Sequence, residues 1–158
     1  MAEIERTGGC ACGGVRYRVH SEPIMVHHCL CRICQRETGT TGVVNAFWES
    51  DRVSIERGDL AETELPGGSG QPHVVRRCST CHTPVIFHYP RLGRAMTAIT
   101  AGTLDEPASI TPDVVLFTDY KLPWVALPEG IPAFPEYYDP RDVLPADRFE
   151  RLKTLSKK

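Results

Sequence analysis

Seven cysteines, gathered in three tight motifs, are the residues of this chain best suited to chemistry. The motifs are a C-x-C pair at 10–12, a C-x-C-x2-C triplet at 29–34 and a C-x2-C pair at 78–81. Such short spacings let one loop present its thiolates to a single metal ion. An odd number of cysteines also leaves one thiol over in a complete disulfide framework. The pattern therefore predicts metal binding, with zinc as the first choice.

The three motifs divide most simply into one closed and one open metal site. The two pairs supply four thiolates, enough for the tetrahedron of a structural zinc ion: Cys10, Cys12, Cys78 and Cys81. The triplet leaves a fourth position free, as catalytic zinc sites do: Cys29, Cys31 and Cys34. Other interpretations stay open. The triplet could take a fourth ligand from a pair, an iron–sulfur cluster could replace zinc, or all seven thiols could be packed as small apolar side chains.

An open zinc site with three thiolates carries a net charge of about −1 and is a weak Lewis acid. It is poorly suited to making hydroxide from water and better suited to holding an incoming thiol as its thiolate. The expected chemistry is thiol activation, in which the bound thiolate attacks a small electrophile. Cys29, Cys31 and Cys34 are therefore the expected catalytic ligands.

Polar residues beside the triplet are candidates for supporting roles. His27 and His28 precede it directly, and either could complete the coordination or act as a general base. Because side chains alternate along a strand, the two are not expected to reach the metal together, and the simpler alternative is that one faces solvent and the other packs on the core. Arg32, Gln35 and Arg36 follow on a predicted helical turn, where they either bind a substrate carboxylate or form a solvated face.

Other chemically capable residues have simpler expectations. His82 is expected beside the closed site or in solvent rather than bound to the ion, and His88 is expected to be an ordinary strand residue. Trp48 and Trp124 could line a pocket, with at least one of them in the core. The aromatic segment 134–139 could line a groove or cover the edge of a sheet.

Short β-strands must position these residues. Alternation of apolar and polar residues at 15–19 and 52–56 predicts half-buried strands, and 13 glycines and 13 prolines divide the chain into short pieces. Further β-rich runs lie at 43–48, 73–77, 85–89, 95–101 and 113–118. With 158 residues, of which 41% are hydrophobic, the chain fits one mainly β domain built from antiparallel sheets.

Two segments are predicted to be helical. One is 31–40, next to the triplet, and the other is a short C-terminal helix that begins near Pro145. We therefore expect a zinc-binding β domain over 1–140 and a helical tail over 141–158. The Gly- and Pro-rich stretch 65–72 is expected to be a loop, either a connector or a lid.

Composition disfavours several partners. The net charge of −2, from 18 basic and 20 acidic residues, gives no basic footprint for nucleic acid. The apolar runs are too short to span a bilayer, and the first residues do not resemble a signal peptide. We therefore expect a cytoplasmic protein with reduced thiols and no nucleic-acid or membrane partner. The oligomeric state stays open.

The motifs, taken in order, resemble the glutathione-dependent formaldehyde-activating family, which includes the zinc domain of centromere protein V. The resemblance covers about residues 8–139 and is carried by Gly9–Gly13, His28–Arg36, Arg77–Cys81, Thr97–Gly102 and Lys121–Trp124. It implies an all-β, zinc-stapled fold similar to the mammalian suppressor of secretion superfamily. It also implies two Zn²⁺ ions, a structural one on the four paired cysteines and a catalytic one on the triplet.

The resemblance implies an activity as well, the addition of glutathione to formaldehyde to give S-hydroxymethylglutathione, a carbon–sulfur lyase reaction run in the synthetic direction. The partners would be a small thiol and formaldehyde or another small aldehyde. The alternative is a non-enzymatic zinc-stapled binding module. Many family members have His where this chain has Leu30, and Gly where it has His82. A zinc knuckle often needs a positive φ at the second position, which Gly supplies freely and His only at some cost, so the change at His82 bears on local geometry more than on metal binding.

Overall fold

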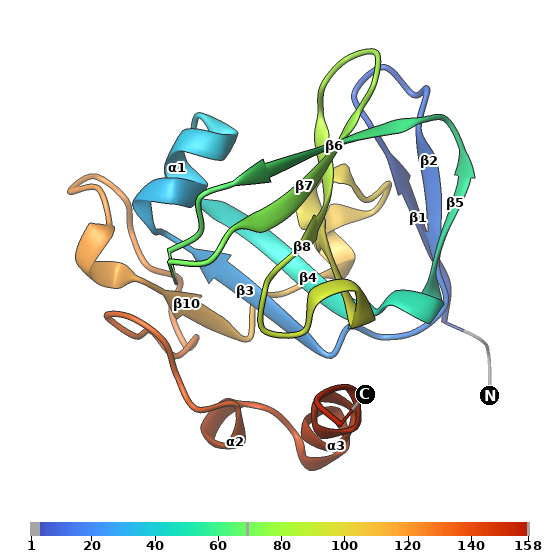
Figure 1. The fold of residues 1–158 in the computed structure, drawn as a ribbon. Helices are drawn as coiled ribbons and strands as arrows, with labels where there is room; N and C mark the ends of the chain where they lie inside the picture. The colour runs from blue at the N-terminus through green and yellow to red at the C-terminus, as the bar shows by residue number, and fades with distance from the viewer. Residues whose placement is uncertain (1–3, 69, 158) are drawn as a thin grey trace.

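The computed structural model describes residues 4–68 and 70–157, which form two β-sheets and a few short helices (Figure 1). A three-stranded sheet has the order β1-β2-β5, and a seven-stranded sheet has the order β10-β3-β4-β9-β8-β7-β6. The strands are β1 (Arg6–Gly9), β2 (Arg16–Val19), β3 (Met25–Cys29), β4 (Val43–Glu49), β5 (Val53–Arg57), β6 (Leu60–Leu65), β7 (His73–Cys78), β8 (Pro84–His88), β9 (Met96–Thr100) and β10 (Val114–Leu116).

The strand pairs are antiparallel with one exception, the parallel pair of β3 and β10. A mainly β fold with a short C-terminal helix is therefore confirmed. The expected β-rich runs all form strands, with bounds shifted by a few residues. Three strands were not expected from the sequence, because β1 ends in two glycines, β3 contains two histidines and a cysteine, and β6 is a charged edge strand.

The helices are α1 (Arg32–Thr38), α2 (Pro140–Val143) and α3 (Ala146–Leu155), and five single 3-10 turns connect the strands. The first helix begins where the Cys31 sulfur accepts a hydrogen bond from the backbone N–H of Cys34, at 3.4 Å. It ends at Gly39, whose φ of 68° is the left-handed conformation that glycine adopts freely. Within the described residues, no helix is both long and apolar enough to cross a membrane.

The seven-stranded sheet packs on both of its faces. One face lies against the small sheet, and Tyr17 and Trp48 are buried between the two sheets. The opposite face lies against α3, where Phe47 and Phe87 pack with Leu152. Adjacent residues of β4 thus serve opposite faces, as the alternation of side chains along a strand requires.

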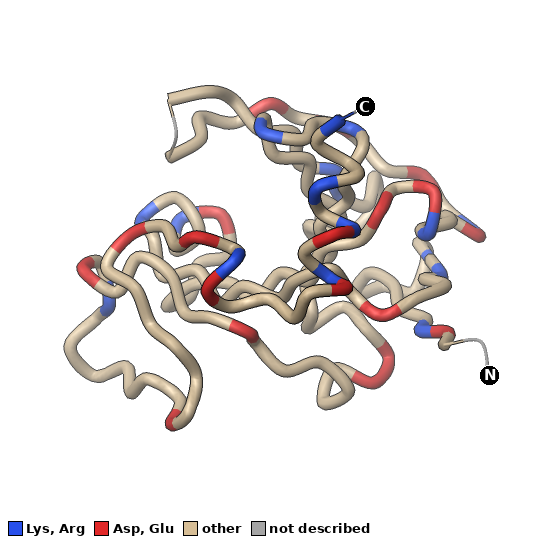
Figure 2. Tube along the Cα trace, turned by 90° about the horizontal axis from the view of Figure 1, so that it is seen from below, with Lys and Arg blue, Asp and Glu red and all other residues tan. Residues whose placement is uncertain are grey.

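Two ion pairs fasten α3 to the strands beneath it. The Arg148 guanidinium pairs with the Asp113 carboxylate, and Arg151 pairs with Glu49 at 2.6 Å. Acidic and basic residues are interspersed along the described chain rather than gathered by sign (Figure 2). The tail is therefore packed on the sheet by both apolar and charged contacts, while the division of the chain at residue 140 stays a prediction.

Candidate metal centres and the adjoining pocket

The two cysteine pairs meet where the two sheets meet. Cys10 and Cys12 follow β1 of the small sheet, Cys78 ends β7, and Cys81 lies in the turn before β8. Their four sulfur atoms all lie within 4.8 Å of one another, with 3.5 Å between the sulfurs of Cys10 and Cys12. One ion of zinc's size fits such a donor set, and it would join the small sheet to the β7–β8 hairpin.

His82 gives the turn that carries Cys78 and Cys81 its shape. Its φ is 61°, which is the positive value that a zinc knuckle often needs after its last cysteine. The backbone N–H of His82 donates to the carbonyl oxygen of Cys78 at 2.9 Å, which closes the turn around the sulfurs. The side chain is exposed and lies outside the metal-ligand group, in agreement with the sequence analysis.

The cysteine triplet forms a second cluster around the start of α1. Cys29 is the last residue of β3, Cys31 caps the helix, and Cys34 lies in its first turn. The three sulfurs lie within 4.8 Å of one another, and within the described residues no histidine or carboxylate joins the group. All seven cysteines of the chain are free thiols. The two clusters of four and three thiols are therefore compatible with zinc, and the expected partition of the cysteines is the one observed.

Hydrogen bonding within the triplet concentrates negative charge on one sulfur. The thiols of Cys29 and Cys34, together with backbone N–H groups of the helix start, lower the pKa of Cys31. The hydrogen bond to Cys31 in turn raises the pKa of Cys29 to about 12, and the pKa of Cys34 is also raised. A divalent cation among the three sulfurs would offset their mutual repulsion and let all three ionise.

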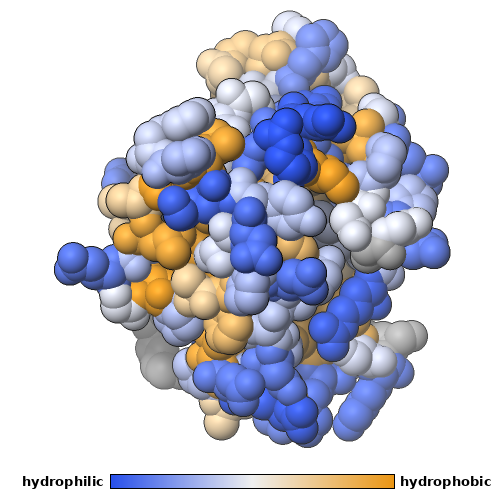
Figure 3. Space-filling view, turned by 90° about the vertical axis from the view of Figure 1, so that its left-hand side faces the viewer, coloured by the Kyte–Doolittle hydropathy of each residue, from blue (hydrophilic) through white to orange (hydrophobic). Residues whose placement is uncertain are grey.

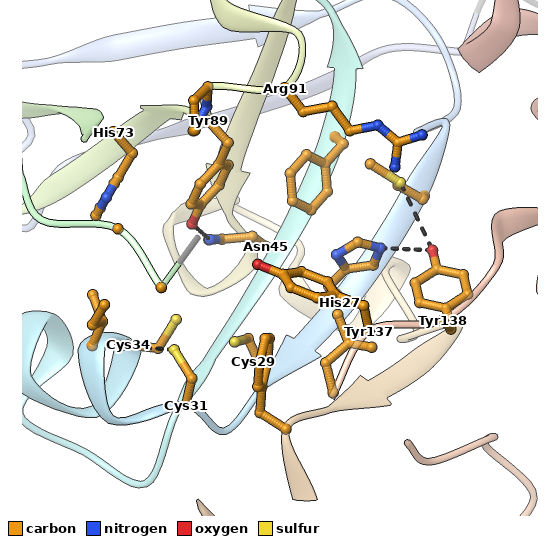
Figure 4. A pocket seen from close by; sticks show the side chains of 18 of the residues that line it. His27, Cys29, Cys31, Cys34, Asn45, His73, Tyr89, Arg91, Tyr137 and Tyr138 are labelled. Atoms are coloured by element: carbon orange, nitrogen blue, oxygen red, sulfur yellow. Dashed lines mark hydrogen bonds between the residues drawn. The ribbon is translucent and has the colours of Figure 1, made fainter. Parts of the chain in front are cut away.

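The triplet lies in the wall of a pocket of about 550 Å³, whereas none of the four paired cysteines does. The wall is formed by strands β3, β4 and β9, by α1, by the loops after β6 and β8, and by the chain between β10 and α2. Figure 4 shows the three cysteines at the lower edge of the pocket, with the rings of Tyr89 and Tyr137 above them. Burial, and then the charges of the cysteines, raise the pKa of Tyr137. A substrate in this pocket would therefore lie against the open site.

His27, and not His28, faces the pocket. His27 shares a face of β3 with Met25 and Cys29, because residues two apart point the same way along a strand. The hydroxyl of Tyr138 lies 2.7 Å from Nε2 of His27, and burial lowers the pKa of this histidine to about 4. The two histidines therefore do not face the triplet together, as expected, and His27 does not belong to the group of possible metal ligands.

The residues predicted on the helical turn divide into three different roles. Arg32 lines the pocket and donates to the side-chain oxygen of Gln35. Gln35 is buried, and its amide donates at 2.9 Å to the backbone carbonyls of both Leu30 and Tyr120. It therefore braces the loop around the triplet rather than facing a ligand. Arg36 is exposed and lies outside the pocket wall.

Neither tryptophan lines the pocket, so that part of the expectation is wrong. Trp48 is fully buried between the sheets, where its indole N–H donates to the carbonyl oxygen of Ser21 at 3.0 Å. Trp124 is 75% exposed. Seen from the side of α1, apolar surface forms separate patches between hydrophilic ones (Figure 3). His88 is the expected strand residue, and its Nδ1 lies 3.0 Å from the backbone oxygen of Met96.

Two expected loops contribute to the pocket. The segment 134–139 both covers the edge of a sheet and lines the pocket, the two alternatives that the sequence left open. Phe134 donates through its backbone N–H to the carbonyl oxygen of Val115 in β10, which covers the sheet edge, while Tyr137 and Tyr138 line the pocket. The loop between β6 and β7 lines the opposite side through its glycines at 67 and 68.

Besides Arg91 and Tyr120, four further polar residues of the pocket were not singled out from the sequence: Glu37, Asn45, His73 and Tyr89. Asn45 gave a usable signal, because a lone amide inside the apolar run of β4 is unusual unless it faces something polar. Glu37 lies three residues after Cys34, hence on the same side of α1. The other two come from β7 and the end of β8, which only the fold brings beside the triplet.

Two packed β-sheets with one closed cluster of four thiols and one pocket-lining cluster of three place the chain among small β proteins whose cysteine clusters could hold metal ions. Residues 5–120 match the profile of the family described as "Glutathione-dependent formaldehyde-activating enzyme". The match covers well over half of the chain, and the chain belongs to this family.

Individual relatives agree with that assignment. A protein of Halomonas elongata, named "Putative glutathione-dependent formaldehyde-activating enzyme", is 27% identical over 127 residues, which are 76% of this chain and 79% of the relative. The crystal structure of a Rhodobacter sphaeroides protein superposes with a TM-score of 0.50 at 19% identity, over 81% of this chain and 99% of that one. At that identity the likeness supports the fold alone.

Proposed function

We propose that this protein is a zinc-dependent enzyme that adds glutathione to formaldehyde or to another small aldehyde, a carbon–sulfur lyase acting in the synthetic direction. One observation carries the proposal. The cluster with three thiols, and not the cluster with four, opens into the pocket. A metal site that lacks a ligand is useful for chemistry only where a substrate can reach it.

The reaction joins a thiol to a carbonyl group. The thiol loses its proton, its sulfur forms a bond with the carbonyl carbon, and the π electrons of the C=O bond move to the oxygen, which takes up a proton. Zinc held by Cys29, Cys31 and Cys34 would lower the pKa of the thiol. With a pKa of about 4, His27 is a weak base at neutral pH. We therefore assign the thiol proton to water, and give His27 and Tyr138 the role of a fixed polar wall.

The proposal has three further parts. Two zinc ions are bound, a structural one by the four paired cysteines and a catalytic one by the triplet. The partners are a small thiol and a small aldehyde, in keeping with the family description. The location is cytoplasmic, because a reducing compartment preserves seven free thiols.

The test is the rate of exchange between glutathione and its formaldehyde adduct, measured by two-dimensional exchange NMR with a no-protein control. Zinc-loaded protein is expected to raise the rate, and Cys31→Ser is expected to abolish that rise and to bind one equivalent of zinc fewer. Arg36→Gln, on the same helix but outside the pocket wall, is the matched control and is expected to keep the full rate.

Two outcomes would contradict the proposal. Full activity in Cys31→Ser, with its second zinc lost, would show that the triplet does not carry the chemistry. No rate rise from wild-type protein with two zinc ions bound would remove glutathione–formaldehyde chemistry and favour the zinc-stapled binding module.

A further inference from the structure

The pocket has a buried polar end on the side away from His27. There the Nε2 atom of His73 lies 2.5 Å from a carboxylate oxygen of Glu37. The two side chains are only 2% and 6% exposed, although both line the pocket. Burying a carboxylate is costly unless its oxygens and the charge are matched by partners. A single imidazole satisfies only part of the hydrogen-bonding capacity of a buried carboxylate, so a further partner for Glu37 is expected at this end of the pocket.

Two more polar atoms at this end have no hydrogen-bond partner among the described residues, Nδ1 of His73 and Oδ1 of Asn45. His73 and Asn45 are each 2% exposed. In the neutral imidazole, the proton on Nε2 is donated to Glu37, which leaves a lone pair on Nδ1. The Asn45 amide donates to the hydroxyl of Tyr89 at 3.0 Å, which leaves its oxygen free to accept. The polar end thus offers acceptors and a negative charge.

Aromatic rings surround these acceptors. The ring of Tyr89 stacks on that of His73 with 5.4 Å between centroids, and Phe47 lies 5.9 Å from Tyr89. Within the described residues, no lysine or arginine forms an ion pair with Glu37. Acceptors with a negative charge and aromatic faces are the environment that a protonated amine prefers. Arg91 also lines the pocket, and Figure 4 shows it at the side opposite His73.

The position of Glu37 relates this end of the pocket to the open cysteine site. Glu37 follows Cys34 by three residues in α1, and residues so spaced on a helix are neighbours, about 5–6 Å apart at their Cβ atoms. One ligand can therefore place its sulfur at the triplet and a second group at Glu37. In Figure 4 the three cysteines lie below and between His73 and Arg91.

We propose that Glu37, His73 and Asn45 form a subsite for the protonated amine of the thiol substrate, and that Arg91 faces a carboxylate of the same molecule. The substrate class is an amino-acid-derived thiol with a free amine. This inference rests on the proposed function, in which glutathione is the member of that class. The amine donates its hydrogens to the Glu37 carboxylate and to the free acceptors of His73 and Asn45, which gives each unpartnered atom a partner.

The deciding experiment compares two ligands on the same protein. Zinc-loaded wild-type protein is titrated calorimetrically with glutathione and with its des-amino analogue, which keeps the thiol and both carboxylates and lacks only the amine. Glutathione is expected to bind more tightly by about tenfold or more, the effect of a charge-assisted hydrogen bond in a buried site. Equal dissociation constants for the two ligands would overturn the amine subsite and leave the proposed thiol chemistry standing.

A variant locates the effect at Glu37. Glu37→Gln keeps the shape and one acceptor but removes the charge, so it is expected to bring glutathione close to the affinity of the analogue. Glu64→Gln, on the exposed edge strand β6, removes the same charge outside the pocket wall and is expected to keep the preference. A preference unchanged in Glu37→Gln would also overturn the subsite. If neither ligand binds protein that holds two zinc ions, the proposed function itself fails.

Discussion

The closed and the open cysteine clusters offer the same kind of ligand atom, the cysteine sulfur, but they differ in where their cysteines lie along the chain. The closed cluster draws its cysteines from two parts of the chain that are far apart, the segment between β1 and β2 and the turn between β7 and β8 together with the last residue of β7, and it lies where the two sheets meet. The open cluster takes its ligands from six consecutive residues at one strand–helix junction. An ion in the closed site closes a long loop and restrains the whole fold, whereas an ion in the open site restrains one local turn. Placement along the chain would therefore separate a stabilising site from the reactive site proposed above.

The largest expected effect is the loss of folding when the closed site is broken. Cys78→Ser removes a sulfur that is 2% exposed and is expected to lower the free energy of unfolding by more than about 3 kcal/mol. Cys31→Ser, the matched variant in the open site, is expected to cost less than about 1 kcal/mol, because the helix start stays capped by an oxygen. Urea unfolding followed by circular dichroism measures both.

The comparison would be reversed by a Cys31→Ser protein that is the less stable of the two. That result would mean that the triplet, and not the four paired cysteines, supplies the metal that the fold requires.

Stepwise removal of metal should separate the two sites without mutation. Because fewer protein ligands hold an ion in the open site, a chelator of increasing concentration is expected to take one zinc equivalent first, with exchange activity lost and circular dichroism unchanged. The second equivalent should leave together with the fold. Zinc released, activity and ellipticity are measured on the same samples. Simultaneous loss of both zinc equivalents would show that the two sites are coupled and that they do not differ in how readily they release metal.

The sequence could predict the metal sites because cysteine spacing is a local property. Loops of two or three residues between ligands fix which thiols can share an ion, and both clusters formed as expected. The strand pattern was equally accessible where apolar and polar residues alternate, as in β2, where Tyr17 and Val19 are buried and the alternating Arg16 and Arg18 are not. Strand β3 was harder, because two histidines and a cysteine carry no apolar alternation.

The pocket could not be predicted in the same way, because it is assembled by sheet order. His73 begins β7 and Tyr89 follows β8, and only the pairing of β8 with β9, and of β9 with β4, brings them to the triplet. The sequence also could not show where the side chain of Leu30 points, at the position where many family members have His. Leu30 lies between two ligands, yet it continues the alternation of β3 and points away from the pocket into the protein, with no exposed surface.

The burial of Leu30 can be tested by comparing the cost of a histidine at position 30 with the cost of one at a pocket-lining position of α1. Leu30→His, which introduces the residue common in the family, is expected to destabilise the protein by about 2–4 kcal/mol, because an imidazole without a partner would replace a fully buried aliphatic side chain. Ile33→His is the matched control. Ile33 lines the pocket and is only partly buried, so its replacement should cost less than about 1 kcal/mol.

Urea unfolding of the two histidine variants decides the matter. Equal costs would place the side chain at position 30 within reach of the pocket, and zinc bound more tightly by Leu30→His would make that position a metal neighbour after all.

The smallest effect concerns the backbone of the closed site. His82 holds a φ of 61°, a conformation that costs a residue with a Cβ atom about 1 kcal/mol relative to its usual regions. His82→Gly is expected to remove that cost, and because glycine also adds freedom to the unfolded chain, the net stabilisation is expected to be about 0.5 kcal/mol or less. Thr80→Gly, in the same turn but without a positive φ, is expected to destabilise it by a similar amount, since glycine there gains no relief and adds freedom to the unfolded chain. Opposite signs in thermal unfolding at constant zinc would locate the strain in one dihedral angle. If both variants were destabilised alike, the His82 side chain would itself stabilise the closed cluster, and residues other than the four cysteines would contribute to that site.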